Sequence, residues 1–174
     1  MTSLTSNTAN GTATQVTRFQ QLPTSLRNTL FRRGITTVGV LALCTEVEVK
    51  MWRKIGPTSC EALETILLTH KLSYRRADEP MLDKARRLYP DVRKIPVGAL
   101  VQLQTLDQAS RQNIVSSNYA RHVLGDFVHL GERELTQLIG RGRGYQGGHA
   151  QRIVNDQVTE IKTFLAALGL RLAD

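Results

Sequence analysis

The segment from Lys54 to Ser59, KIGPTS in one-letter code, has the residue types of an anion-binding helix start. Proline is favoured at the first position of a helix, where its missing N–H would be unpaired anyway, so we expect a helix to begin at Pro57. The free backbone N–H groups and the positive dipole end of such a start attract phosphate. Gly56 permits close approach or a positive φ, and the hydroxyls of Thr58 and Ser59 add donors. A plain turn between two helices is the alternative.

Further groups that suit a polyanion occur elsewhere in the first half of the chain, and its basic residues are expected on different faces. Asn28 can hydrogen-bond a sugar or a base edge in the DNA minor groove, where the pattern of donors and acceptors is degenerate. With about 3 to 5 phosphate contacts for each DNA-binding module, a plot of the logarithm of the binding constant against the logarithm of the salt concentration would have a slope of roughly −3 to −4. This slope is called the salt slope below. A surface position or a local cap is the plainer role for Asn28. The basic residues that can supply charge are Arg27, Arg32, Arg33, Arg53 and Lys54.

The second half of the chain weakly repeats the first. Ser25 and Asn28 recur as Ser110 and Asn113 at an offset of 85 residues, and similar offsets relate other short motifs. We therefore expect a duplicated helical module, with Ser110 and Asn113 as DNA contacts of the second copy. Chance similarity between short helical sequences is the alternative.

The second copy carries an insertion rich in glycine and arginine, at residues 140–149. Arg141 and Arg143 alternate with glycines there, as in flexible arginine/glycine segments that bind nucleic acid. A solvated loop is the alternative.

The sequence predicts neither an enzyme nor a bound cofactor. It contains no phosphate-binding GxxxxGK[ST] motif, no GxSxG and no HExxH. Its four histidines are scattered, without the spacing of metal ligands. Cys44 and Cys60 form no CxxC motif, so we expect small buried hydrophobic residues in a reducing compartment. Catalytic residues, cofactors and metals are therefore all expected to be absent.

Positive charge is concentrated in the first half of the chain. Residues 1–76 hold 10 Lys and Arg against 4 Asp and Glu, whereas residues 77–105 and 106–174 each carry a net charge of only +1. This distribution favours a polyanionic partner. No apolar run approaches the roughly 20 residues of a membrane span, and the N-terminus lacks the pattern of a signal peptide. A cytoplasmic protein without membrane contact is expected.

Helical patterns dominate from Leu22 onward. Leu22, Leu26 and Leu30 recur every four residues, and Gly34 is a plausible helix stop. We expect a short turn at residues 38–42, followed by a capping box at residues 45–48 that opens a helix ending near residue 52. Residues 1–15 are too polar to offset the entropy of ordering, which predicts a disordered tail.

The segment 76–104 reads as a connector punctuated by Pro80, Pro90 and Pro96. One short amphipathic helix is expected between the first two prolines. The stretch 96–103 is compatible with either a strand or a helix. A strong closing helix is predicted by the spacing of Val154, Val158, Ile161, Leu165 and Leu168.

Residues 22–74 resemble the C-terminal domain of the bacterial RNA polymerase alpha subunit, without gaps. The resemblance implies a compact four-helix domain with a helix-hairpin-helix element that binds the DNA minor groove and touches transcription factors. It implies DNA contacts at Asn28, Gly56 and Ser59. Ser25 and Thr58 stand where that family has basic residues. The matching residues are Leu22, Asn28-Thr-Leu30, Gly34-Ile35, Val38-Gly-Val-Leu41, Thr45-Glu-Val-Glu-Val49, Ile55-Gly56, Ser59 and Leu72.

These patterns together predict an all-α protein with two tandem small domains of helix-hairpin-helix type, at 16–75 and 105–174. The predicted function is non-enzymatic binding of double-stranded DNA with low sequence specificity, in transcription regulation or another DNA transaction. The alternative is a protein-interaction module that binds RNA polymerase, other transcription proteins or a DNA-processing complex. The predicted DNA-binding residues are Ser25, Arg27, Asn28, Arg53, Lys54, Gly56, Thr58, Ser59, Ser110, Asn113, Arg141 and Arg143.

Overall fold

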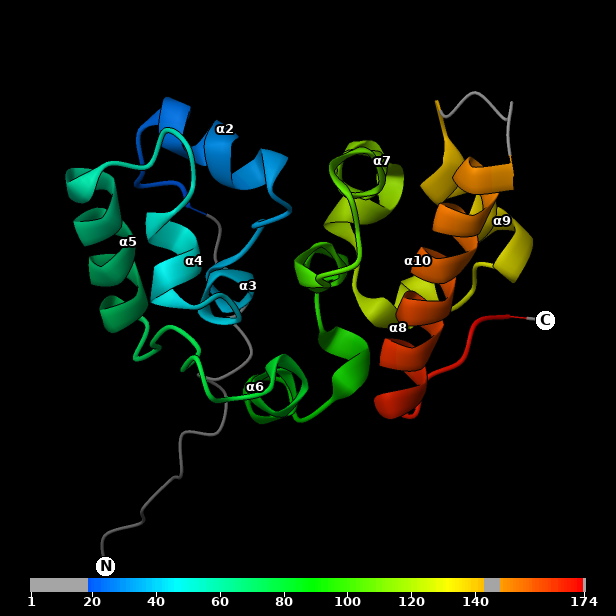
Figure 1. The fold of residues 1–174 in the computed structure, drawn as a ribbon. Helices are drawn as coiled ribbons and strands as arrows, with labels where there is room; N and C mark the ends of the chain where they lie inside the picture. The colour runs from blue at the N-terminus through cyan, green and yellow to red at the C-terminus, as the bar shows by residue number, and fades with distance from the viewer. Residues whose placement is uncertain (1–18, 143–147, 174) are drawn as a thin grey trace, which may run out of the picture.

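The first part of the described chain forms a group of helices around one hydrophobic core. The computed structural model describes residues 19–142 and 148–173. Buried side chains from Phe19 to Leu67 make up the first core, and Figure 1 shows its helices at one end of the molecule. These helices are α2 (Thr24–Arg32), α3 (Val38–Ala42), α4 (Glu46–Lys50) and α5 (Pro57–Thr69).

A second core lies at the other end of the molecule, around the closing helix (Figure 1). Within the described residues the chain forms helices and isolated bridges but no strand, which confirms the predicted all-α class. The predicted tail falls on residues outside the described part of the chain. The helices of the second core are α7 (Gln108–Ser116), the 3-10 helix η3 (Asn118–Arg121), α8 (Leu124–Phe127), α9 (Glu132–Gly140) and α10 (Gly148–Ala167).

The segment between the two cores is folded into the second of them. The helix expected between the first two prolines is confirmed as α6 (Met81–Leu88), and the undecided stretch that follows is a 3-10 helix, η2 (Val97–Gln102). A shorter 3-10 helix, η1 (Val92–Lys94), lies between them and packs on α8. Residues 97–101 of η2 are all buried, so this segment supplies core side chains.

Several local signals in the first half are confirmed. Gly34 follows the end of α2 with φ 73°. The side chain of Thr45 accepts a hydrogen bond from the Glu48 N–H, and Glu48 in turn accepts one from the Thr45 N–H, so α4 begins with a capping box. Pro57 is the first residue of α5.

The turn predicted at residues 38–42 is wrong, because the chain forms the one-turn helix α3 there. The Thr37 hydroxyl accepts a hydrogen bond from the Val40 N–H at 3.2 Å and so caps this helix. All five residues of α3 are buried. Burial in the first core stabilises a helix that is too short to form by itself.

The two halves close in the same way after their last long helix. The residue beyond the helix end has a positive φ in both, 55° at Lys71 and 76° at Gly169. A backbone hydrogen bond then spans five residues in each half, Leu72 N–H to Leu67 O and Leu170 N–H to Leu165 O. The chain finally returns to the start of α4 or α9 through a parallel bridge, Thr45 with Arg75 and Gly131 with Ala173.

The junction between the two halves leaves no room for additional atoms. A Cβ on Gly98 would lie 2.2 Å from the Gly34 carbonyl oxygen, and a Cβ on Gly34 would lie 2.7 Å from the Val101 side chain. The Gln102 side-chain amide donates to the Arg33 carbonyl oxygen at 3.0 Å. The 3-10 helix η2 is therefore locked onto the end of α2.

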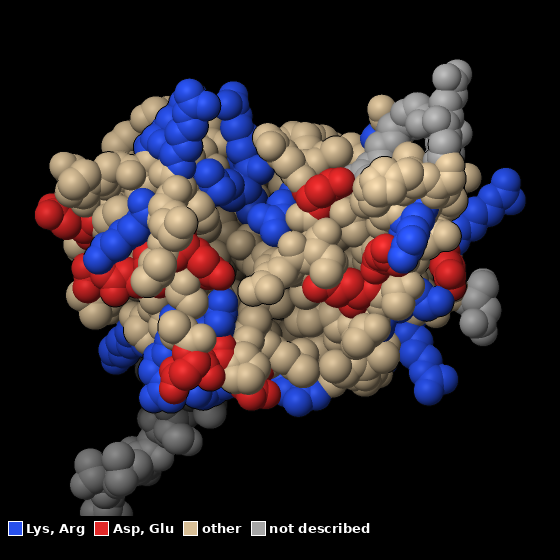
Figure 2. Space-filling view, in the orientation of Figure 1, with Lys and Arg blue, Asp and Glu red and all other residues tan. Residues whose placement is uncertain are grey.

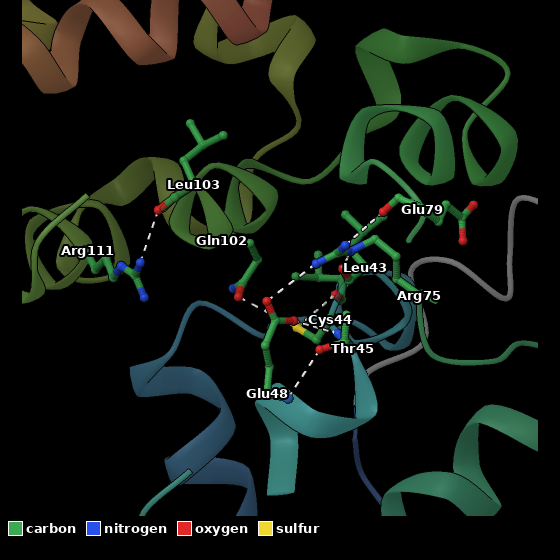
Figure 3. A network of polar contacts seen from close by, with 10 residues as sticks. Leu43, Cys44, Thr45, Glu48, Arg75, Glu79, Gln102, Leu103 and Arg111 are labelled. Atoms are coloured by element: carbon green, nitrogen blue, oxygen red, sulfur yellow. Dashed lines mark hydrogen bonds and ion pairs between the residues drawn. The ribbon is translucent and has the colours of Figure 1, made fainter. Parts of the chain in front are cut away.

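Arg75 fixes the start of the connecting segment to the first half (Figure 3). Its side chain is only 13% exposed. The guanidinium donates to the Leu43 and Glu79 carbonyl oxygens, each at 2.8 Å, and lies 3.4 Å from a Glu48 carboxylate oxygen. These bonds satisfy carbonyl groups that would otherwise be costly to bury.

Candidate nucleic-acid interface

Helix α2 presents one apolar and one basic side. Its buried residues are Leu26 and Leu30, which pack in the first core. Among the described residues, no hydrogen bond uses the Asn28 side chain, and the Arg27 guanidinium bonds only to the nearby Thr24 hydroxyl, at 3.0 Å. These groups are thus available to a ligand. The polar residues that α2 exposes include Ser25, Arg27, Asn28 and Arg32.

The loop between α4 and α5 adds two exposed cations, Arg53 and Lys54. Lys54 has φ 72°, so the left-handed residue of this loop is a lysine. The positive φ considered for Gly56 is not found, since Gly56 has φ −96° and is the N-cap of α5. A Cβ on Gly56 would meet nothing within 4 Å. The backbone here is therefore open to close approach.

The first turn of α5 comes directly after Gly56 and contains the two hydroxyl residues of the predicted anion site. Thr58 is exposed and Ser59 is half-buried. The first helical hydrogen bond within this turn runs from the Cys60 N–H to the Gly56 carbonyl oxygen. The N–H groups before Cys60 point out of the helix start, as in any helix without a side-chain cap.

Helix α2 and the α4–α5 loop meet through a cation–π contact. The Arg33 guanidinium lies 4.9 Å from the centroid of the Trp52 ring. Trp52 is half-buried and packs against the first core beneath this arginine. Figure 2 shows Lys and Arg side chains gathered over α2 and continuing toward the boundary between the two halves. We call this surface the basic face and define it as Ser25, Arg27, Asn28, Arg32, Arg33, Arg53 and Lys54.

The basic face carries unbalanced positive charge. No described carboxylate forms a salt bridge with any of its five cations. Burial, and secondarily the positive charge of Arg111, lower the pKa of Arg33. An anion placed on this face would relieve the repulsion between the cations.

In the second half of the chain, the polar residues of the Ser-x-x-Asn motif make contacts inside the protein. Ser110 is fully buried, and its hydroxyl donates to the side chain of Gln157 on α10. The Asn113 amide donates to the carbonyl oxygens of Ile139 and Arg141, at 3.1 and 2.9 Å, and so holds the end of α9. The buried Ser110 side chain therefore cannot make the predicted DNA contact. The Asn113 side-chain amide already donates to two carbonyl oxygens of the protein.

The arginines predicted in the glycine-rich insertion are only partly described. Arg141 is exposed at the end of α9. Arg143 lies outside the described residues.

Sequence reasoning missed Arg111, which lies beside α2 at the junction. Helices α2 and α7 are in contact. The Arg111 guanidinium donates to the carbonyl oxygens of Leu106 and Leu103, at 2.7 and 3.0 Å, which holds it in place. The repeated Ser-x-x-Asn motif contains Arg111 at its second position, but the motif match drew attention to Ser110 and Asn113 instead.

Metal sites and membrane-spanning helices are absent from the described part of the chain. No three His, Cys, Asp or Glu side chains among them gather in a way that could hold a metal ion. None of the helices in residues 19–142 and 148–173 has the length and apolar character needed to cross a membrane. The chain matches no protein-family model, no curated protein and no solved structure.

Proposed function

We propose that this chain is a non-enzymatic protein that binds the backbone and minor groove of double-stranded DNA with low sequence specificity. The observation that carries the proposal is the basic face, where two elements of the first half bring five cations together without a carboxylate partner among the described residues. Contacts between arginine or lysine and phosphate give affinity without reading sequence. A role in transcription regulation or another DNA transaction would follow from the resemblance to the polymerase alpha domain.

We also propose that the fold consists of two tandem domains of helix-hairpin-helix type. The recurring order of α2–α5 and α7–α10 supports this, as do the matching closures after α5 and α10. In this view the α4–α5 loop with Gly56 is the hairpin of the first domain.

Fluorescence anisotropy with a labelled random-sequence duplex, titrated at several salt concentrations, tests the DNA proposal. We expect roughly micromolar binding at low salt that weakens with a slope of about −3 to −4. Changing Arg53 and Lys54 together to Gln removes two phosphate contacts and reduces the slope by about 1.8. The matched control changes the adjacent exposed pair Arg93 and Lys94 on η1 to Gln, with no loss of affinity. Absence of binding by the unmodified protein at low salt would refute the proposal.

Two further substitutions locate the contact surface. Asn28→Ala removes an exposed side chain that has no described hydrogen bond, so the fold should be unaffected. Gly56→Glu places a negative charge at the open start of α5, where space is available. Both should weaken binding while the helical circular dichroism spectrum stays the same. Unchanged affinity in both would place the DNA elsewhere on the molecule.

A second candidate function, protein interaction, is favoured by an exposed apolar groove between α4 and α5. Val47 and Leu68 are 62% and 65% exposed, and both line a groove of about 410 Å³ together with Glu46 and Glu64. The groove is also lined by Arg75 and Arg76, so its rim carries charges of both signs. Its exposed apolar side chains suit the apolar face of an amphipathic segment of a partner protein. Such a partner would belong to the transcription machinery or to a DNA-processing complex.

Calorimetric titration with a synthetic amphipathic helix of leucines and lysines tests this candidate. Binding that is lost in Leu68→Ser but retained in the distant control Thr136→Ser would support it. Failure of the unmodified protein to bind the peptide would count against the groove and leave the DNA proposal intact.

A further inference from the structure

The junction between α2 and α7 holds two arginines that have no carboxylate partner. Neither Arg33 nor Arg111 forms a salt bridge with a described Asp or Glu. Burial raises the pKa of Glu160, and the charge of Arg111 only partly opposes this rise. Helices α2 and α7 are in contact, and after burial the positive charge of Arg111 is the second cause that lowers the pKa of Arg33. The two partly buried cations therefore repel each other, and the site favours an anion.

Contacts within the protein hold both arginines in place. Arg33 lies over the Trp52 ring, and its backbone carbonyl accepts from the Gln102 amide. Arg111 uses two of its N–H groups on backbone carbonyls of Leu103 and Leu106. Its remaining N–H groups are left for a ligand, as is the whole guanidinium of Arg33, for which no hydrogen bond is described. Guanidinium groups that are already held in one orientation lose little conformational entropy when they bind an oxyanion.

The junction is also continuous with the basic face. Arg33 belongs to that face, and Figure 2 shows its Lys and Arg side chains extending to the boundary between the two halves. The second copy has Ser110 in the core and Asn113 on the end of α9, so the first copy's pattern of contacts is not repeated there. Arg111 is the residue by which the second half of the chain adds positive charge next to the basic face.

We infer that Arg33 and Arg111 together hold one phosphodiester group of a DNA backbone, so that a single duplex is bound across both halves of the chain. This inference rests on the proposed DNA binding and adds the second half to its surface. A phosphate oxygen pair between two guanidinium forks would receive charge-assisted hydrogen bonds from both halves. The end of η2 links the two arginines, because the Gln102 amide donates to the Arg33 carbonyl oxygen and the next residue, Leu103, accepts from the Arg111 guanidinium.

The test uses the full chain and the duplex titration described above. Arg111→Gln should lower affinity about tenfold at low salt, because a hydrogen-bonded charge is lost. It should also reduce the salt slope by about 0.9, the value for one phosphate contact. Arg33→Gln should do the same. Because both arginines serve one phosphate, the double variant should reduce the slope by about 0.9 rather than about 1.8.

Two controls separate charge from structure. Arg111→Lys keeps the charge, so it should retain the full salt slope even where some affinity is lost. Arg171→Gln removes an exposed arginine in the segment that follows α10, and should change neither quantity. Circular dichroism establishes that each variant is folded. Trp52 fluorescence is a second check for the Arg111 and Arg171 variants only, because Arg33 itself lies over the Trp52 ring.

The outcomes distinguish the two proposals. If the unmodified protein binds DNA and both Gln variants keep its affinity and slope, the junction site is refuted while the basic face stands. If the salt slope of the double variant is smaller in magnitude by about 1.8, the two arginines contact separate phosphates and the shared site is refuted. If the unmodified protein does not bind DNA at low salt, both proposals fail together.

Discussion

The two long helices are followed by the same left-handed backbone angle but by different residue types. Lys71 and Gly169 occupy the same position after α5 and α10, with φ 55° and 76°. A residue with a Cβ in this left-handed region costs about 1 to 2 kcal/mol, whereas glycine adopts it freely. The first half therefore carries a local strain that the second half avoids.

Exchanging the two residue types should shift stability in opposite directions. Lys71→Gly should raise the free energy of unfolding by about 0.5 kcal/mol, after the greater freedom of glycine in the unfolded chain is taken into account. Gly169→Lys should lower it by about 1 kcal/mol. Urea denaturation followed by circular dichroism measures both. Equal effects of the same sign would contradict the assignment of strain to this angle.

Glu160 gives the protein a pH dependence that is unusual for a carboxylate. One of its carboxylate oxygens is buried without a hydrogen-bond partner in the described structure. Burial raises its pKa above the ordinary 4.5, and a hydrogen bond from the Thr105 backbone and the charge of Arg111 only partly oppose this. The folded state thus holds the proton more tightly than the unfolded state.

Stability should consequently fall as pH rises from about 4.5 through the raised pKa of Glu160. Glu160→Gln removes the titration, so the variant should be more stable than the unmodified protein at pH 7. The two should converge below pH 4.5, where Glu160 is protonated in both states. Urea midpoints measured between pH 4 and pH 8 test this. A variant that is less stable at pH 7 would show that the charged form makes a favourable interaction.

At the scale of elements, the contact of η2 with α2 depends on the missing side chain of Gly98. A methyl group there would lie 2.2 Å from the Gly34 carbonyl oxygen, which is too close for the two elements to remain in place. Gly98→Ala should lower the free energy of unfolding by about 2 to 3 kcal/mol, as expected for overpacking in a rigid site.

Gly148→Ala is the matched control, because a methyl group there meets nothing within 4 Å. It should change stability by less than about 1 kcal/mol. Thermal or urea unfolding of both variants gives the comparison. A Gly98→Ala protein as stable as the control would mean that the junction can move apart at little cost.

The sequence predicted those elements whose signals are local. The capping box at Thr45 and Glu48, the helix start at Pro57 and the stop at Gly34 each depend on a few neighbouring residues. Hydrophobic spacing likewise predicted α2 and α10. These features follow from hydrogen bonds and backbone angles within one turn.

Features that depend on distant contacts were not predictable. The helix α3 exists because the first core buries it, and its sequence has no helix-specific pattern. Ser110 is buried by packing, and the hydrogen bond that compensates its buried hydroxyl is to Gln157, 47 residues away. The position of Arg111 beside α2 depends on how η2 locks the halves together. The repeated Ser-x-x-Asn motif therefore did not predict which of its side chains are exposed, since Ser110 is buried whereas Ser25 is exposed.

At the scale of the whole molecule, the two cores are joined as one packed body. Leu43 lies in the first half of the chain but belongs to the second core, and Leu88 packs against both. The Arg75 network and the close approach of Gly34 and Gly98 add polar and steric links between the halves. Unfolding one half would expose apolar surface of the other, which favours a single cooperative transition.

The single tryptophan makes this cooperativity measurable. Trp52 fluorescence reports on the first half alone, whereas the circular dichroism of the helices reports on both halves. In urea, the two signals of the unmodified protein should give the same midpoint. Gly98→Ala forces η2 away from α2, so its two midpoints should separate, while those of Gly148→Ala should still coincide. Separate midpoints in the unmodified protein would mean that the halves unfold independently. The fixed spacing of Arg33 and Arg111, on which binding of one duplex by both halves depends, would then be lost.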